Sequence, residues 1–200
     1  MQCKIKATAM HPGDIIQSAE GLTIEVTNTD AEGRLTLADA IWYGRNEIDG
    51  DVIIDLATLT GAMKVATGKK IAGMFCNDDE LANDLLNSAY NGGERLWRMP
   101  LFDDCCVDNG ENSYINAMDS DIADLKNAEK GGYGGAITAA LFLKRFVEST
   151  KTNKKIPVWA HIDVAGPVWN DKKGHEQSNV GATGYGVRTL TNYVLNKCKV

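Results

Sequence analysis

The chain has 200 residues, which is enough for one domain with a substantial core. Hydrophobic residues make up 44% and charged residues 24%, close to the average for globular proteins, which excludes a disordered or fibrous class. The formal net charge of -6, together with the lack of a signal-peptide core or a membrane-length apolar stretch, predicts a cytoplasmic protein that binds small molecules or peptides rather than nucleic acid or membranes.

Apolar strands alternate with amphipathic helices along the chain, which predicts an α/β fold. Residues 15–16 and 22–26 predict a hairpin, and apolar positions three and four residues apart predict a helix from Leu35 to about residue 48. A nearly continuous apolar run at residues 51–57 then predicts a buried strand. The later predicted elements are helices at about residues 80–90, 136–148 and 187–197 and a strand at residues 158–164.

The stretch NTDAEGRLTLADA, at residues 28–40, carries Asp30, Glu32 and Arg34 at alternate positions. We expect an extended segment here, so that the three side chains point to one side. Carboxylates bind divalent cations, and one carboxylate can bridge two metals about 3.5–4 Å apart in hydrolytic sites. Arg34, opening the next helix, would bind an anion. The alternative is that Asp30 caps the helix and Arg34 merely neutralises the acids.

Residues 58–62, TLTGA, follow the predicted strand 51–57 at the sheet edge where open α/β sheets bind ligands. Other candidate sites are weaker. His161 lies in an apolar strand, so we expect a hydrogen-bonded core histidine rather than a metal ligand. Asp119, Asp121 and Asp124 lack the glycine and terminal glutamate of a calcium loop, so we expect surface or helix-cap acids.

The whole stretch NTDAEGRLTLADA resembles very closely the signature of the leucyl aminopeptidase family, the cytosolic dinuclear metallo-exopeptidases. Other segments, in the family's order, are similar to the same family: HPGDII, GLTIEV, DLATLTGA, GERLWRMPL, SDIADLKN, GGAITAALFLKRFV, WAHIDVAGP and GATGYGVRTL. The resemblance covers nearly the whole chain. It implies a hydrolase with a three-layer α/β sandwich and a mixed sheet, which releases N-terminal amino acids from peptides.

Carried over position by position, the resemblance implies that Asp30 binds one metal ion and that Glu32 bridges two. The ions would be manganese or zinc, with magnesium as a further candidate. Arg34 would hold a bicarbonate ion that acts as the general base. The backbone N–H groups that would assist it belong to Ala31, Gly33 and Leu59.

The resemblance also implies a small, mostly apolar pocket for the first side chain of the substrate. Its lining residues would be Thr58, Gly61, Ala165 and Val168. Family members are hexamers, so we expect a homo-oligomer or a complex with a complementary chain. A nucleic-acid role, known for some bacterial relatives, is poorly supported by the acidic balance.

The first ten residues depart from the family pattern. The family takes a lysine and two aspartates as metal ligands, and a second, catalytic lysine, from a region before the PGD turn. Here MQCKIKATAM contains Lys4 and Lys6, which do not match the motif, and no acid. We therefore expect residues 1–200 to be the C-terminal portion of the catalytic domain, truncated at its N-terminal side.

Two functional expectations follow from this departure. Two carboxylates would hold an ion only weakly, so the isolated chain would be inactive and would require a complementary polypeptide. The missing strands would also leave a sheet edge exposed. The alternative is a non-catalytic, oligomerising remnant that acts as an interaction module.

Overall fold

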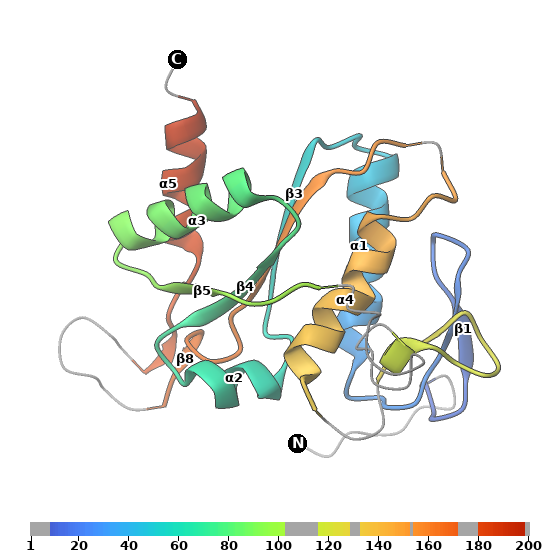
Figure 1. Cartoon of the computed structure of the whole chain (residues 1–200). Helices are drawn as coiled ribbons and strands as arrows, with labels where there is room; N and C mark the ends of the chain where they lie inside the picture. Colours follow the sequence, from blue (N-terminus) through green and yellow to red (C-terminus); the bar gives the residue numbers. More distant parts are fainter. Residues whose placement is uncertain (1–8, 103–115, 129–132, 153, 172–179, 199–200) are drawn as a thin grey trace.

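The structure is a computed structural model that describes residues 9–102, 116–128, 133–152, 154–171 and 180–198. A mixed four-stranded sheet lies at its centre, in the order β3 (Val52–Ala57), β7 (Val158–Asp163), β4 (Ala72–Cys76) and β5 (Leu96–Arg98). β3 runs parallel to β7, β7 antiparallel to β4, and β4 parallel to β5. Helices cover both faces (Figure 1), which confirms the predicted three-layer α/β sandwich with a mixed sheet.

The two faces of the sheet carry different helices. One face packs against α1 (Glu32–Asn46), α2 (Gly61–Thr67) and α4 (Gly135–Val147), and the other against α3 (Asp79–Asn91) and α5 (Val187–Lys197). Strand β7 contributes to both cores, because successive side chains of a strand point to opposite faces. Trp159 packs in the core with α1 and α4, whereas Ala160 and Ile162 pack in the core with α3 and α5.

Short strands complete the described part of the chain. The predicted hairpin is confirmed as β1 (Ile15–Gln17) and β2 (Thr23–Glu25), and β2 pairs in parallel with β6 (Leu125–Lys126). β8 (Trp169–Asn170) pairs with β9 (Gly181–Ala182), and Asn116–Met118 form a 3-10 turn. Among these described elements, no helix has both the length and the apolar character that a membrane span requires.

Strand β3 was predicted to be buried, but its residues are only half-buried or exposed. Within the described residues it pairs with β7 alone and lies at an edge of the sheet. The fully buried strand is β4, which the sequence pattern did not predict. Its interior glycine makes room for helix α2, since a Cβ at Gly73 would lie 2.3 Å from Met63 Cε.

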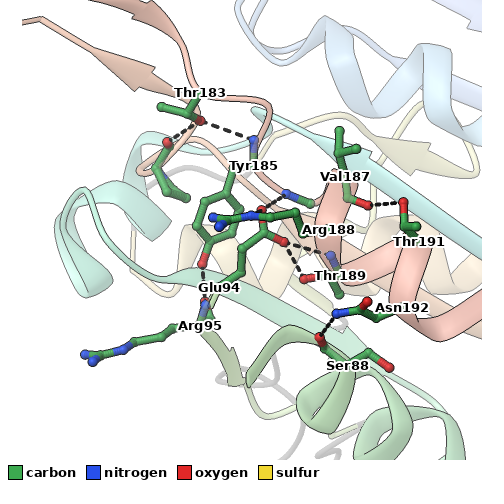
Figure 2. Close-up of polar contacts among 12 residues, drawn as sticks. Ser88, Glu94, Arg95, Thr183, Tyr185, Val187, Arg188, Thr189, Thr191 and Asn192 are labelled. Carbon is green, nitrogen blue, oxygen red and sulfur yellow. Dashed lines mark hydrogen bonds and ion pairs between the residues drawn. The ribbon is translucent and has the colours of Figure 1, made fainter. Parts of the chain in front are cut away.

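A buried carboxylate from a distant segment holds the last helix, α5 (Figure 2). Glu94, which is 3% exposed, accepts hydrogen bonds from the Gly186 N–H at 3.0 Å, the Thr189 N–H at 2.9 Å and the Thr189 hydroxyl at 2.6 Å. The N–H groups of a first helical turn have no partner inside the helix, and a carboxylate there is favoured by the helix dipole. Asn192 of α5 also donates to the Ser88 carbonyl of α3 at 3.1 Å. The segments GERLW and GYGVRTL therefore meet in one buried contact.

Candidate functional site

The segment that carries Asp30, Glu32 and Arg34 is a turn leading directly into α1, not an extended strand. Helix α1 begins at Glu32, three residues earlier than predicted, with an acidic side chain in the first turn that the helix dipole favours. Residues two apart on a helix point to different sides. Asp30 and Glu32 are exposed, whereas Arg34 is 8% exposed and belongs to the buried face of the helix. The prediction that all three side chains point to one side is therefore wrong.

The alternative role of Asp30 as the helix cap is wrong as well. Ala31 occupies the N-cap position of α1, and no side chain caps it. The Asp30 N–H donates to Asn28 Oδ1 at 2.9 Å, which shapes the turn before the helix. The Asp30 carboxylate is exposed at this turn and accessible to a cation.

Asn127 holds this turn from a distant part of the chain, and the sequence analysis did not single it out. The side chain is fully buried. Its Oδ1 accepts from the Thr27 N–H at 2.9 Å and the Asn28 N–H at 3.2 Å, and its Nδ2 donates to the carbonyls of Asn28 at 2.7 Å and Ala31 at 3.4 Å. The segment SDIADLKN, which ends at Asn127, was the available signal. The resemblance indicates that this segment is similar to the family, but it does not predict which backbone groups the Asn127 side chain contacts.

A second group of residues gathers at the carboxyl ends of β3 and β7, as predicted for residues 58–62. Asp163, fully buried at the end of β7, accepts from the Leu59 N–H at 3.1 Å, the Thr60 N–H at 3.0 Å and the Thr60 hydroxyl at 2.7 Å. It also accepts from the Ala165 N–H at 3.1 Å. The Thr60 hydroxyl in turn accepts from the Met63 N–H at 3.0 Å and caps α2. The Leu59 N–H, expected to assist an anion, thus donates to Asp163 in this structure.

The two groups meet at Gly33 and Leu59. A Cβ at Gly33 would lie 3.2 Å from Leu59 Cδ1, so the first turn of α1 lies against the loop after β3. Around this contact, Thr58 and Gly61 are exposed, and a Cβ at Gly61 would meet nothing within 4 Å. Ala165 is half-buried in the turn after β7. The structure therefore brings the DAEGR turn and the TLTGA loop together.

The remaining pocket candidate, Val168, is half-buried and packs against the core formed with α3 and α5. Its N–H donates to the Val164 carbonyl at 3.2 Å, within the turn that follows β7. The structure thus places Val168 in the same turn as Ala165, with its side chain packed toward the α3 face of the sheet.

The histidine in the central strand is a core residue, as predicted. His161 is 1% exposed, and its Nδ1 lies 2.5 Å from Asp55 Oδ1. Asp55 also accepts from Trp159 Nε1 at 2.8 Å. Cross-strand neighbours on β3 and β7 thus satisfy the Asp55 carboxylate and one nitrogen of the imidazole.

Asp119, Asp121 and Asp124 are surface groups, as expected. Asp124 Oδ2 accepts from the Thr23 N–H and from the Thr23 hydroxyl, both at 2.8 Å. Both hydrogen bonds favour the ionised carboxylate and hold the pKa of Asp124 below its ordinary value. The bond from the backbone N–H has the larger effect. Lys4 and Lys6 lie outside the described residues.

The two carboxylates of the DAEGR turn do not form a complete metal site. Oxygen ligands suit hard divalent cations, but such ions take more ligands than Asp30 and Glu32 supply. Within the described ranges, no group of three or more histidine, cysteine, aspartate or glutamate side chains could hold a metal ion. The residues present fit the chemistry of the predicted ions but not the ligand number.

Comparison with known proteins identifies the same family as the sequence motifs. The catalytic-domain model of the cytosol aminopeptidase family matches residues 1–191. A probable cytosol aminopeptidase of Cyanothece sp. is 53% identical over 191 residues, which cover 96% of this chain and 35% of that protein. One from Synechococcus elongatus is 52% identical over 192 residues, covering 96% and 36%.

A solved structure gives the same assignment. A mutant of tomato leucine aminopeptidase matches with a TM-score of 0.80 and 50% sequence identity, over 96% of this chain and 34% of the tomato chain. The chain thus spans about a third of the length of the curated relatives that it matches. It belongs to the cytosol aminopeptidase family.

Proposed function

We propose that this chain forms part of the active site of a metal-dependent aminopeptidase, which releases the N-terminal residue of peptides. The observation that carries the proposal is the contact between Gly33 and Leu59. This contact sets the turn with the two accessible carboxylates beside the loop at the carboxyl end of β3, where open α/β sheets bind ligands. Family membership supplies the reaction type.

In this proposal Asp30 and Glu32 are metal ligands, with Glu32 shared between two ions. Manganese, zinc and magnesium are the candidates, and such ions supply Lewis acidity in hydrolytic sites. The exposure of both carboxylates supports the assignment. Because two ligands are too few, the remaining ligands would come from polypeptide outside the described residues.

Arg34 is proposed to bind an anion, with bicarbonate as the candidate general base. Its guanidinium belongs to the first turn of α1, where backbone N–H groups and the helix dipole favour negative charge. Of the three N–H groups expected to assist, that of Ala31 donates to the Asn28 carbonyl at 3.2 Å and that of Leu59 to Asp163. Gly33, in the first turn, is therefore the strongest candidate.

The substrate's first side chain is proposed to lie among Thr58, Gly61, Ala165 and Val168. The open space around Gly61 and the partial exposure of Ala165 support this placement. We further propose a cytoplasmic protein, because the relatives are named cytosol aminopeptidases. Peptides as substrates and assembly as a hexamer are proposed from the family.

A chimaera tests the proposal. The residues that precede the matched region in the Synechococcus elongatus relative are fused to this chain, and hydrolysis of leucyl-p-nitroanilide is measured with added Mn²⁺. We expect turnover, and Glu32→Ala should reduce kcat/KM by at least about a hundredfold, since a bridging ligand is lost. The matched control is Glu47→Ala, which changes an exposed glutamate at the other end of α1 and should leave activity unchanged. Full activity of the Glu32→Ala chimaera would overturn the proposal.

A further inference from the structure

A single buried carboxylate holds both sides of the proposed substrate pocket. Asp163 Oδ1 accepts from Leu59 in the loop after β3 and from Ala165 in the turn after β7. Because one oxygen atom receives both N–H groups, their separation is limited by two hydrogen-bond lengths. Asp163 Oδ2 meanwhile binds Thr60 through its N–H and its hydroxyl.

These donors adjoin the residues proposed to contact substrate. Leu59 and Thr60 lie between Thr58 and Gly61 in the chain, and Ala165 is itself a proposed pocket residue. A buried carboxylate is costly unless it is fully hydrogen-bonded, so the four donors and Asp163 depend on one another. Movement of either segment would leave part of this carboxylate without a partner.

Helix α2 contacts the loop after β3 and the turn after β7 at its two ends. At its start, the Thr60 hydroxyl joins Asp163 to the N-cap position. At its end, the turn after β7 packs so closely that a Cβ at Gly166 would lie 2.0 Å from the Gly68 carbonyl oxygen. The loop, the turn and α2 therefore form one connected, closely packed unit around Asp163.

We propose that Asp163 is a positioning residue that sets the distance between the 58–61 loop and Ala165, and thereby the size of the N-terminal side chain that the pocket accepts. The inference rests on the proposed function, and it assigns to Asp163 a part in selecting the N-terminal side chain of the substrate. One methylene group in a hydrophobic pocket changes discrimination by about 10- to 200-fold, so small shifts of the two segments have measurable effects.

The test compares two isosteric substitutions of carboxylates in neighbouring strands, Asp163, which is buried, and Asp55, which is half-buried. Asp163→Asn keeps the shape of the side chain but turns one oxygen into a donor, so either the Leu59 and Ala165 N–H groups or the Thr60 N–H and hydroxyl lose their acceptor. The matched control is Asp55→Asn on β3, since the hydrogen-bond partners of Asp55 among the described residues are Trp159 and His161, which belong to neither segment. Both variants lose a hydrogen-bonded carboxylate oxygen, but only the first should move the pocket.

Two readouts separate positioning from general stability. In the 200-residue chain, amide hydrogen exchange of Leu59, Thr60 and Ala165 should accelerate about tenfold or more relative to helix α3 in Asp163→Asn, but not in Asp55→Asn. In the chimaera, the ratio of kcat/KM for leucyl- and alanyl-p-nitroanilide should change about fivefold or more in Asp163→Asn and stay constant in the control.

Uniform acceleration of exchange, or an unchanged substrate ratio in active Asp163→Asn chimaera, would overturn the inference. If Asp163→Asn does not fold, Thr60→Val decides in its place, since it removes the hydroxyl that binds Asp163 and caps α2 but leaves the Leu59 and Ala165 contacts with Asp163. It should change the exchange at Thr60 and the substrate ratio in the same direction. If the unsubstituted chimaera hydrolyses neither substrate, the proposed function fails, and the exchange pattern alone decides whether Asp163 holds the two segments.

Discussion

Asn127 shows how one buried side chain can define a loop that is distant from it in the sequence. Its amide accepts from two N–H groups and donates to two carbonyls of the turn before α1. Neither aspartate nor alanine reproduces this pattern, because an ionised carboxylate can only accept hydrogen bonds and a methyl group makes none. The direction in which Asp30 points therefore depends on Asn127.

We expect Asn127→Ala to lower the free energy of unfolding by about 2–4 kcal/mol, because it leaves buried backbone groups without partners. Urea unfolding measures the loss. Asn46→Ala is the control, since Asn46 donates only to the Trp42 carbonyl of its own helix, at 2.9 Å, and should cost less than about 1 kcal/mol. Equal losses in the two variants would contradict the role given to Asn127.

Thr23→Val should raise the pKa of Asp124 toward its ordinary value, because it removes the hydroxyl donor and leaves the backbone donor. Since the pKa is lowered in the folded chain, the contact stabilises the fold above the carboxyl's unfolded pKa, and this contribution disappears as the pH falls through the folded value. Asp124 is exposed, so the contribution is small. An NMR titration of Asp124 measures the shift, and Thr191→Val, on α5, should leave it unchanged.

Among the secondary-structure elements, three amphipathic helices and the N-terminal hairpin were predicted correctly, whereas strand β4 and the start of α1 were not. The predicted bounds of α3, α4 and α5 agree with the structure to within one residue. Strand β4 was missed because all its residues are buried and show no alternation, and Gly73 in its interior is unfavourable in strands. The early start of α1 was missed because the turn before it depends on Asn127, about 100 residues away.

At the level of helix α5, Glu94→Ala should lower the free energy of unfolding by about 3 kcal/mol, since the first turn of the helix loses a buried charged acceptor. Amide exchange should rise first in α5. The control is Glu80→Ala, which changes an exposed glutamate 3.4 Å from Lys197 Nζ and should have little effect on stability. Unchanged exchange in α5 of the Glu94→Ala variant would show that other contacts hold the helix.

For the molecule as a whole, the sequence predicted which segments lie together better than how their side chains are arranged. Segments far apart in sequence meet as the resemblance implied, through Gly33 with Leu59 and through Asp163 with Ala165. The common orientation predicted for Asp30, Glu32 and Arg34 is wrong, because the directions of these side chains depend on where α1 begins. The proposal that further polypeptide completes the site rests on two features of the described residues, the small number of candidate metal ligands and the pairing of β3 with β7 alone.

The most direct test of this account is the affinity for Mn²⁺, measured from the electron paramagnetic resonance signal of the free ion. We predict that the 200-residue chain binds Mn²⁺ only weakly, with a Kd of roughly millimolar order, because two carboxylates are too few. The chimaera should bind far more tightly, and Glu32→Ala should abolish the tight binding while Glu47→Ala preserves it. Tight binding by the 200-residue chain, or by the Glu32→Ala chimaera, would contradict the account.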